Sequence, residues 1–166
     1  MRRAGTIGLA ALVAATLMAG CRAPNEAPAD GDVDSDAGVT SEPCPDAVDK
    51  TRGCIYLGLI SDLTGPVSAL GATATEGVKA FWKRVNANGG IGGRYEVDAT
   101  TYVKDSKYDP QIHNQAYQEI KSKVLALGLT FGSATTAASL PDMRTNNVLA
   151  VPGAFSSAFL FEDVML

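Results

Sequence analysis

A hydroxyl-rich segment at residues 132–136 is the part of this sequence best suited to holding a ligand. It runs Gly-Ser-Ala-Thr-Thr, follows an apolar stretch and opens a segment of helical spacing. The N–H groups of a first helical turn have no intrahelical acceptor, and the helix dipole makes that end positive. Hydroxyls beside such N–H groups form a suitable binding site for a carboxylate. Ordinary N-capping explains one of these residues but not four small or hydroxylated ones in a row, so we predict ligand contact here.

Candidates for catalysis are few. His113 lies in the middle of a predicted helix without a partner motif, and the chain has no G-x-S-x-G elbow. Asp62, at the end of the first predicted strand, is the best lone acid for a base, although a turn-capping role suits it better. One histidine and three cysteines also disfavour a zinc site. We therefore expect no enzymatic activity and no cofactor.

Two glycine-containing segments raise a nucleotide-binding alternative. Residues 89–93 (GGIGG) follow a predicted helix and precede a strand, whereas a phosphate cradle needs the opposite order. Residues 62–71 have that order but lack both G-x-G-x-x-G and a P-loop lysine. Residues 44–166 carry 12 acids and 11 bases, which gives no drive toward phosphate backbones. Nucleotide and nucleic-acid binding are both disfavoured.

The first twenty residues predict an export signal. Arg2 and Arg3 give a positive start, and residues 7–18 form an uncharged run rich in Ala and Leu. Twelve helical residues reach about 18 Å, which is short of the roughly 30 Å hydrocarbon core of a bilayer. We therefore expect residues 1–20 to be a signal peptide rather than a membrane span.

Cys21 directly follows Met-Ala-Gly, which resembles the lipobox of bacterial lipoproteins, with Met18 where Leu is usual. The resemblance implies that Cys21 is lipidated and becomes the new N-terminus, with two acyl chains giving stable anchoring. Residues 22–43 are rich in Pro, Gly and Asp and almost free of large apolar side chains. Such a composition cannot offset the entropy of ordering. We expect 21–43 to be a lipidated cysteine and a disordered acidic tether, with the folded domain at 44–166.

With Cys21 lipidated, Cys44 and Cys54 remain as an even pair in an exported chain, which predicts a disulfide. The short loop between them corresponds to roughly 2 to 3 kcal/mol of stabilisation in the chain-entropy description. We expect this bond to fix the first strand of the domain. Because the spacing is not C-x-x-C, a thiol-exchange enzyme is disfavoured.

Hydrophobic periodicity predicts alternating strands and helices. Residues 55–61 form a continuous apolar run, as in a strand buried on both faces. Asp109 and Pro110 have the residue types of a helix cap and first turn. Further strands are predicted at 95–103, 125–131 and 148–151, and helices at 72–87, 110–124 and 136–146. This alternation implies right-handed crossovers and a doubly wound parallel α/β sheet.

Two of the predicted helices carry apolar stripes that should face the core. In the first, the stripe is Val78, Phe81, Trp82 and Val85; in the second, it is Ile112, Ala116, Ile120 and Val124. In an open parallel sheet, ligands bind beyond the carboxyl ends of the strands. The segments placed there are 62–71, 104–109, 132–136 and 152–157.

Several motifs in order resemble the leucine/isoleucine/valine-binding family. These are periplasmic-type, two-lobed substrate-binding proteins of ATP-binding cassette transporters. The resemblance rests on GLISDLTGPVSALG (58–71), Glu-Gly (76–77), NANGGIGGR (86–94), Asp-Pro (109–110), GSATTAAS (132–139) and VPGAF (151–155). It covers about residues 55–159 and implies that a small solute, often an amino acid, is captured between two lobes and passed to permease subunits.

The resemblance also implies the positions of ligand contacts. The carboxylate-binding residues after the third strand correspond to Ser133, Thr135 and Thr136, and those after the fourth to Gly153, Ala154 and Ser156. Phe155 stands near a position where Thr is common, and Leu70 where an aromatic is common, which suggests apolar contacts for the ligand's side chain.

Family members are considerably longer, so we expect this sequence to be most of one lobe, with other ligand contacts in the second lobe. The expected location is extracytoplasmic, in the periplasm or anchored at the outer face of the cytoplasmic membrane. Two alternatives remain: the ligand-sensing domain of a receptor or regulator, and an anchored flavodoxin-like enzyme. A complete gene that continues into a spanning helix would favour the first, and a retained chromophore or nucleotide the second.

Overall fold

Strands and helices alternate along residues 37–166, which are the part of the chain described by the computed structural model. The predicted signal peptide at 1–20, Cys21 and most of the predicted tether lie outside the described residues. The elements are β1 (Val39–Thr40), β2 (Gly53–Ser61), α1 (Ser68–Ala87), β3 (Tyr95–Asp105), α2 (Pro110–Ile120), β4 (Ala126–Phe131), α3 (Ser133–Asn146), β5 (Ala150–Gly153) and the 3-10 helix η1 (Ser157–Phe161). None of the helices in this part of the chain is long and apolar enough to cross a bilayer.

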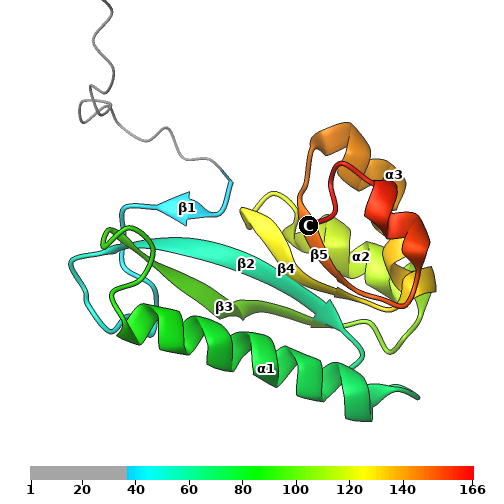
Figure 1. The fold of residues 1–166 in the computed structure, drawn as a ribbon, viewed down its shortest axis with the longest axis horizontal. Coiled ribbons are helices and arrows are strands. Elements are labelled where there is room, and N and C mark those ends of the chain that lie inside the picture. Colours follow the sequence, from blue (N-terminus) through cyan, green and yellow to red (C-terminus); the bar gives the residue numbers. More distant parts are fainter. Residues whose placement is uncertain (1–36) are drawn as a thin grey trace, which may run out of the picture. The chain divides into compact units, whose positions relative to one another are not determined.

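The sheet confirms the predicted doubly wound α/β topology. β2 pairs in parallel with β3 on one side and with β4 on the other, and β5 pairs in parallel with β4. The connection after β2 runs to β3 on one side and the connection after β4 runs to β5 on the other, which creates a switch point between the loops that follow the adjacent strands β2 and β4. Figure 1 shows α1 on one side of the strands and α2 and α3 on the other.

Side-chain alternation along the strands builds a core on each face of the sheet. Leu59 packs with Leu129 on the face covered by α1, whereas the next residue, Ile60, packs with Leu127 on the face covered by α2 and α3. Both faces are apolar because both are covered by helices, which explains the continuous apolar run in β2.

Helix α1 confirms part of the predicted stripe. Val78 and Trp82 pack against the core, together with Ala74 one turn earlier. Phe81 is 47% exposed, so its assignment to the buried face was wrong. It lies at the border of the stripe, where its ring contacts Trp82 edge-on and the Arg84 guanidinium covers it.

Helix α2 begins as predicted, since the Asp109 carboxylate accepts hydrogen bonds from the N–H groups of Gln111 and Ile112, with Pro110 in the first turn. Its buried face confirms the predicted stripe at Ala116 and Ile120 and differs at Ile112, which is only partly buried. The buried positions are His113, Ala116, Tyr117 and Ile120, which follow the i, i+3, i+4, i+7 spacing of a helix face. The predicted i+4 series drifts away from this face because a turn has 3.6 residues. The helix ends at Ile120, before Val124, although Val124 is buried in the same core as predicted.

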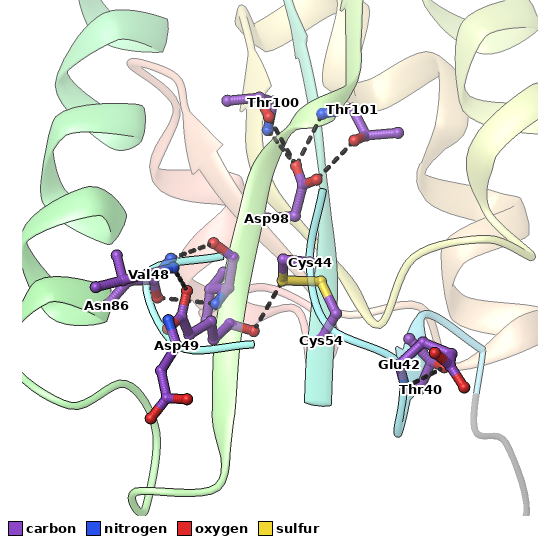
Figure 2. Close-up of a disulfide and its surroundings, with 12 residues drawn as sticks. Thr40, Glu42, Cys44, Val48, Asp49, Cys54, Asn86, Asp98, Thr100 and Thr101 are labelled. Carbon is purple, nitrogen blue, oxygen red and sulfur yellow. Dashed lines mark hydrogen bonds between the residues drawn. A yellow bond between two sulfur atoms is a disulfide. The ribbon is translucent and has the colours of Figure 1, made fainter. Parts of the chain in front are cut away.

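The amino-terminal end of the sheet contains the predicted disulfide, which joins Cys44 to Cys54 at the start of β2 (Figure 2). The predicted boundary of the tether differs from the structure. Val39–Thr40 forms β1 and pairs antiparallel with Ile55 and Cys54, so the last residues before 44 belong to the fold. Strand pairing satisfies the backbone N–H and C=O groups there without large apolar side chains.

Candidate ligand-binding site

The loop after β2 is held by Asp62. Its side chain is fully buried, and its two carboxylate oxygens accept hydrogen bonds from the N–H groups of Gly65 at 2.5 Å and Val67 at 2.7 Å. Asp62 therefore serves as the turn cap rather than as a base, because both oxygens are occupied. Gly71 in the first turn of α1 packs directly on this loop, and a Cβ placed on it would lie 2.2 Å from the Asp62 carbonyl oxygen.

Asp105 joins the loops that follow β2 and β3. Its carboxylate accepts from the Thr64 hydroxyl at 2.5 Å and from the N–H groups of Leu63 at 2.9 Å and Lys107 at 3.0 Å. Burial raises the pKa of Asp105, but the hydrogen bonds from Thr64, Leu63 and Lys107 outweigh it and the pKa is lowered. An ionised Asp105 thus fixes two of the four loops at the carboxyl edge of the sheet.

The loop after β3 contains two consecutive residues in the left-handed region, Lys107 with φ 50° and Tyr108 with φ 58°. Such conformations cost free energy for residues other than glycine. They direct the Tyr108 ring toward β4, where it contacts Phe131 edge-on, and a Cβ placed on Gly132 would lie 2.6 Å from Tyr108 Cε2. Gly132, at φ 94°, is therefore required both for its backbone and for the space that Tyr108 occupies.

The predicted hydroxyl-rich segment forms the amino-terminal end of α3, which begins at Ser133 rather than at 136. No side chain caps this helix, and helix geometry leaves its first N–H groups without intrahelical acceptors. Thr135 and Thr136 are fully buried with their hydroxyls directed inward. The Thr135 hydroxyl shares its one proton between the carbonyl oxygens of Phe131 and Gly132, and the Thr136 hydroxyl donates to the Thr130 carbonyl at 3.1 Å. Of the three hydroxyls in this turn, only that of Ser133 is left to face outward.

Ser133 lines a hollow of about 130 Å³ at the carboxyl edge of the sheet. A second hollow of about 430 Å³ adjoins it and shares Leu70, Phe131, Gly153, Ala154 and Phe155 with it. The second hollow extends along α1 past Thr73 and Ala74. The arrangement combines one hydroxyl and a positive helix end with an apolar wall, which suits a carboxylate that bears an apolar group.

Five of the eight predicted ligand contacts therefore share one hollow: Leu70, Ser133, Gly153, Ala154 and Phe155. The other three do not. Thr135 and Thr136 are buried, while Ser156 caps η1 by accepting from the Ala158 N–H and lines a different hollow. Sequence reasoning missed Val67, Tyr108 and Phe131 as lining residues. Val67 and Tyr108 lie within segments assigned to the carboxyl edge, and Phe131 ends the third predicted strand. These positions in the sequence could have identified them as lining residues.

These observations define the class: a lobe of the type I periplasmic-binding-protein fold, with its candidate site at the switch point of the sheet. The family model described as "Periplasmic binding protein" matches residues 54–162. The chain therefore belongs to the periplasmic binding protein family. No curated protein sequence matches it.

Several solved structures share the fold. A fatty acid ABC transporter substrate-binding protein from Thermomonospora curvata is 29% identical with a TM-score of 0.64, covering 78% of this chain and 30% of that one. The branched-chain amino acid transporter substrate-binding protein LivJ from Streptococcus pneumoniae, in complex with isoleucine, is 24% identical with a TM-score of 0.58, covering 68% and 33%. A branched chain amino acid ABC transporter from Thermus thermophilus with bound valine is 16% identical with a TM-score of 0.58, covering 69% and 30%. This chain thus spans about a third or less of the length of these structures.

Proposed function

We propose that the chain is part of an extracytoplasmic solute-binding protein that captures a branched-chain amino acid or a related carboxylate and delivers it to an ATP-binding cassette transporter. The observation that carries the proposal is the uncapped end of α3 with Ser133 beside it, which opens on an apolar hollow. Free N–H groups and the helix dipole favour a carboxylate, and Leu70 and Phe155 offer an apolar wall for its side chain. Capture of this kind needs no bond-making step, and closure of two lobes on the solute would give the permease the form it recognises.

A fatty acid is the second candidate ligand. The larger hollow is lined almost wholly by apolar groups and continues along α1, and the 29% identical structure is named for fatty acids. Both ligands would place a carboxylate at the amino-terminal end of α3, so they differ only in the length of the apolar group that the hollow must hold. Mass spectrometry of the ligand retained by the purified, complete gene product distinguishes the two directly.

Calorimetry on the complete gene product tests the site itself. With L-leucine as the probe, Ser133→Ala should weaken binding by roughly 1 to 3 kcal/mol through the lost hydrogen bond. Ser157→Ala is a matched control, because Ser157 is exposed in η1 and lines neither of the two hollows. Equal affinities for L-leucine in the wild type and both variants would mean that the solute does not bind at Ser133.

The lipid anchor is a separate part of the proposal and depends on Cys21, which lies outside the described residues. Cys21→Ala should prevent lipidation and release the protein from the membrane fraction. Membrane fractionation of cells that express the two forms checks this. A variant that stays membrane-bound and processed like the wild type would exclude the anchor without affecting the solute-binding proposal.

A further inference from the structure

Behind the hydroxyl-rich turn, three buried polar side chains join α2, β4 and α3. His113 of α2 lies with Nε2 2.9 Å from the Thr130 hydroxyl of β4, which lies 3.0 Å from the Thr136 hydroxyl of α3. All three residues are fully buried. The Thr136 hydroxyl also lies 3.1 Å from the Thr130 carbonyl oxygen, so the series begins on an imidazole and ends on the strand backbone.

Counting protons fixes the direction of this series. The carbonyl of Thr130 can only accept, so the Thr136 hydroxyl donates its one proton there. Thr136 Oγ1 must then accept from the Thr130 hydroxyl, which uses that group's only proton. Thr130 Oγ1 in turn must accept from His113, so Nε2 carries a hydrogen. All three hydrogen bonds form together only in this direction.

The reverse direction loses the hydrogen bond to the Thr130 carbonyl and leaves a buried N–H group without an acceptor among the described residues. If Nε2 accepted from Thr130, the Thr136 hydroxyl would have to turn from the Thr130 carbonyl to the Thr130 hydroxyl. His113 Nδ1 would then carry the hydrogen, and Nδ1 is buried with no hydrogen-bond partner among the described residues. A buried donor without an acceptor is costly, whereas the opposite tautomer leaves only a bare acceptor there. Burial also lowers the pKa of His113 to about 4, which keeps the ring neutral near pH 7.

We propose that His113, as the neutral Nε2–H tautomer, is a positioning residue that orients the first turn of α3 through Thr130 and Thr136. Thr136 sits in that turn, and its N–H donates to the Gly132 carbonyl at 3.0 Å. Gly132 in turn donates its N–H to Gly153 at 3.0 Å, on the strand that carries the other wall of the hollow. The imidazole thus orients the turn that carries Ser133 and the free N–H groups from the side away from the ligand. It lines neither of the two hollows itself.

The tautomer can be measured directly, because His113 is the chain's only histidine. Two-bond proton–nitrogen NMR of the full chain, ¹⁵N-labelled at histidine and purified without a histidine tag, should show one form between pH 6 and 8, with Nε2 protonated and Nδ1 bare. A protonated Nδ1, or a tautomer mixture that titrates near pH 6.5 as a free imidazole does, would overturn the proposal.

Hydrogen exchange of the full chain tests the positioning role without any solute. His113→Leu should speed exchange of the Gly132 and Thr136 amides at least tenfold more than that of amides within α1. His113→Gln offers an amide donor in place of Nε2–H, and it should stay within about threefold of the wild type at Gly132 and Thr136. Uniform acceleration throughout the chain, or equal behaviour of the two variants, would mean that His113 only fills space.

The effect on affinity rests on the proposed function, and it is measured on the complete gene product with L-leucine. Binding to His113→Leu should be at least tenfold weaker than to the wild type, with His113→Gln within threefold. Wild-type affinity in His113→Leu would overturn the positioning role in binding. If the wild type itself does not bind L-leucine, that amino-acid assignment fails, whereas the tautomer and exchange results still decide whether His113 orients the turn.

Discussion

The two ends of the sheet use the same kind of anchor but differ in what they leave open. At the amino-terminal end, buried Glu96 accepts from the N–H groups of Val48 and Asp49, each at 2.8 Å, inside the loop that the Cys44–Cys54 disulfide closes (Figure 2). At the carboxyl end, Asp62 and Asp105 hold their loops in the same way.

What surrounds these carboxylates differs. The amino-terminal loop is closed covalently, and Asn86 of α1 pairs with both the N–H and the C=O of Val97 on the edge strand β3 (Figure 2). At the carboxyl end, α3 starts without a side-chain cap and Phe155 is 100% exposed. The amino-terminal end is therefore closed by a covalent bond and paired backbone, while the carboxyl end keeps unpaired N–H groups and bare apolar surface, which are what a ligand can use.

The Glu96 anchor gives the largest expected effect. Glu96→Ala should lower the free energy of unfolding by roughly 3 to 5 kcal/mol, because two partly buried N–H groups lose their acceptor and Arg52 keeps only Asp49 as a partner among the described residues. Urea unfolding of the full chain measures this. Glu76→Ala is the control, since Glu76 is exposed and pairs only with Lys79 in an i, i+3 ion pair. Equal losses of unfolding free energy in the two variants would mean that the Glu96 hydrogen bonds contribute no more than an exposed ion pair.

His113 gives the next effect, and it concerns the carboxyl end. Because burial lowers its pKa from 6.5 to about 4, the unfolded chain binds the proton more readily. Stability from this group is present above pH 6.5 and is lost as pH falls toward 4, by roughly 3 kcal/mol. His113→Gln should remove that component, so its unfolding free energy should fall less between pH 7 and 4 than that of the wild type. Parallel pH profiles would show that the imidazole is not buried as described.

Removing the disulfide sharpens the comparison at the amino-terminal end. Cys44→Ala/Cys54→Ala should cost roughly 2 to 3 kcal/mol, mainly by freeing the unfolded chain. Thermal and urea unfolding with and without a reducing agent check this, because reductant should lower the stability of the wild type but leave the double variant unchanged. A wild type that is insensitive to reductant although its thiols are shown to be free would contradict the expected stabilisation.

The smallest expected effect is a gain at the carboxyl end. Lys107→Gly should raise the free energy of unfolding by up to about 1 kcal/mol, because glycine adopts φ 50° without the cost that lysine bears. Lys123→Gly, in an exposed position at φ < 0, serves as the control and should not stabilise. Denaturant unfolding measures both. A loss of stability in Lys107→Gly would mean that the lysine side chain contributes more than its backbone conformation costs.

The sequence predicted the alternation of elements, the parallel sheet and the Cys44–Cys54 pair, since these depend on local periodicity and on residue types. The sequence-based prediction was wrong where contacts between distant parts of the chain determine which side chains are buried. The buried face of α2 includes His113 and Tyr117 because β4 and α3 offer them Thr130 and Asp142 as partners, and spacing alone does not reveal these partners.

The candidate site divides in the same way. Apolar runs followed by Gly, Ser and Thr determined that the loops at the carboxyl edge would meet and that a helix would begin at residues 132–136. Only the tertiary structure decided that Ser133 opens on the hollow while Thr135 and Thr136 turn inward. A side chain's direction on a helix depends on the turn at which the helix starts, and here Gly132 and the Tyr108 ring set that start.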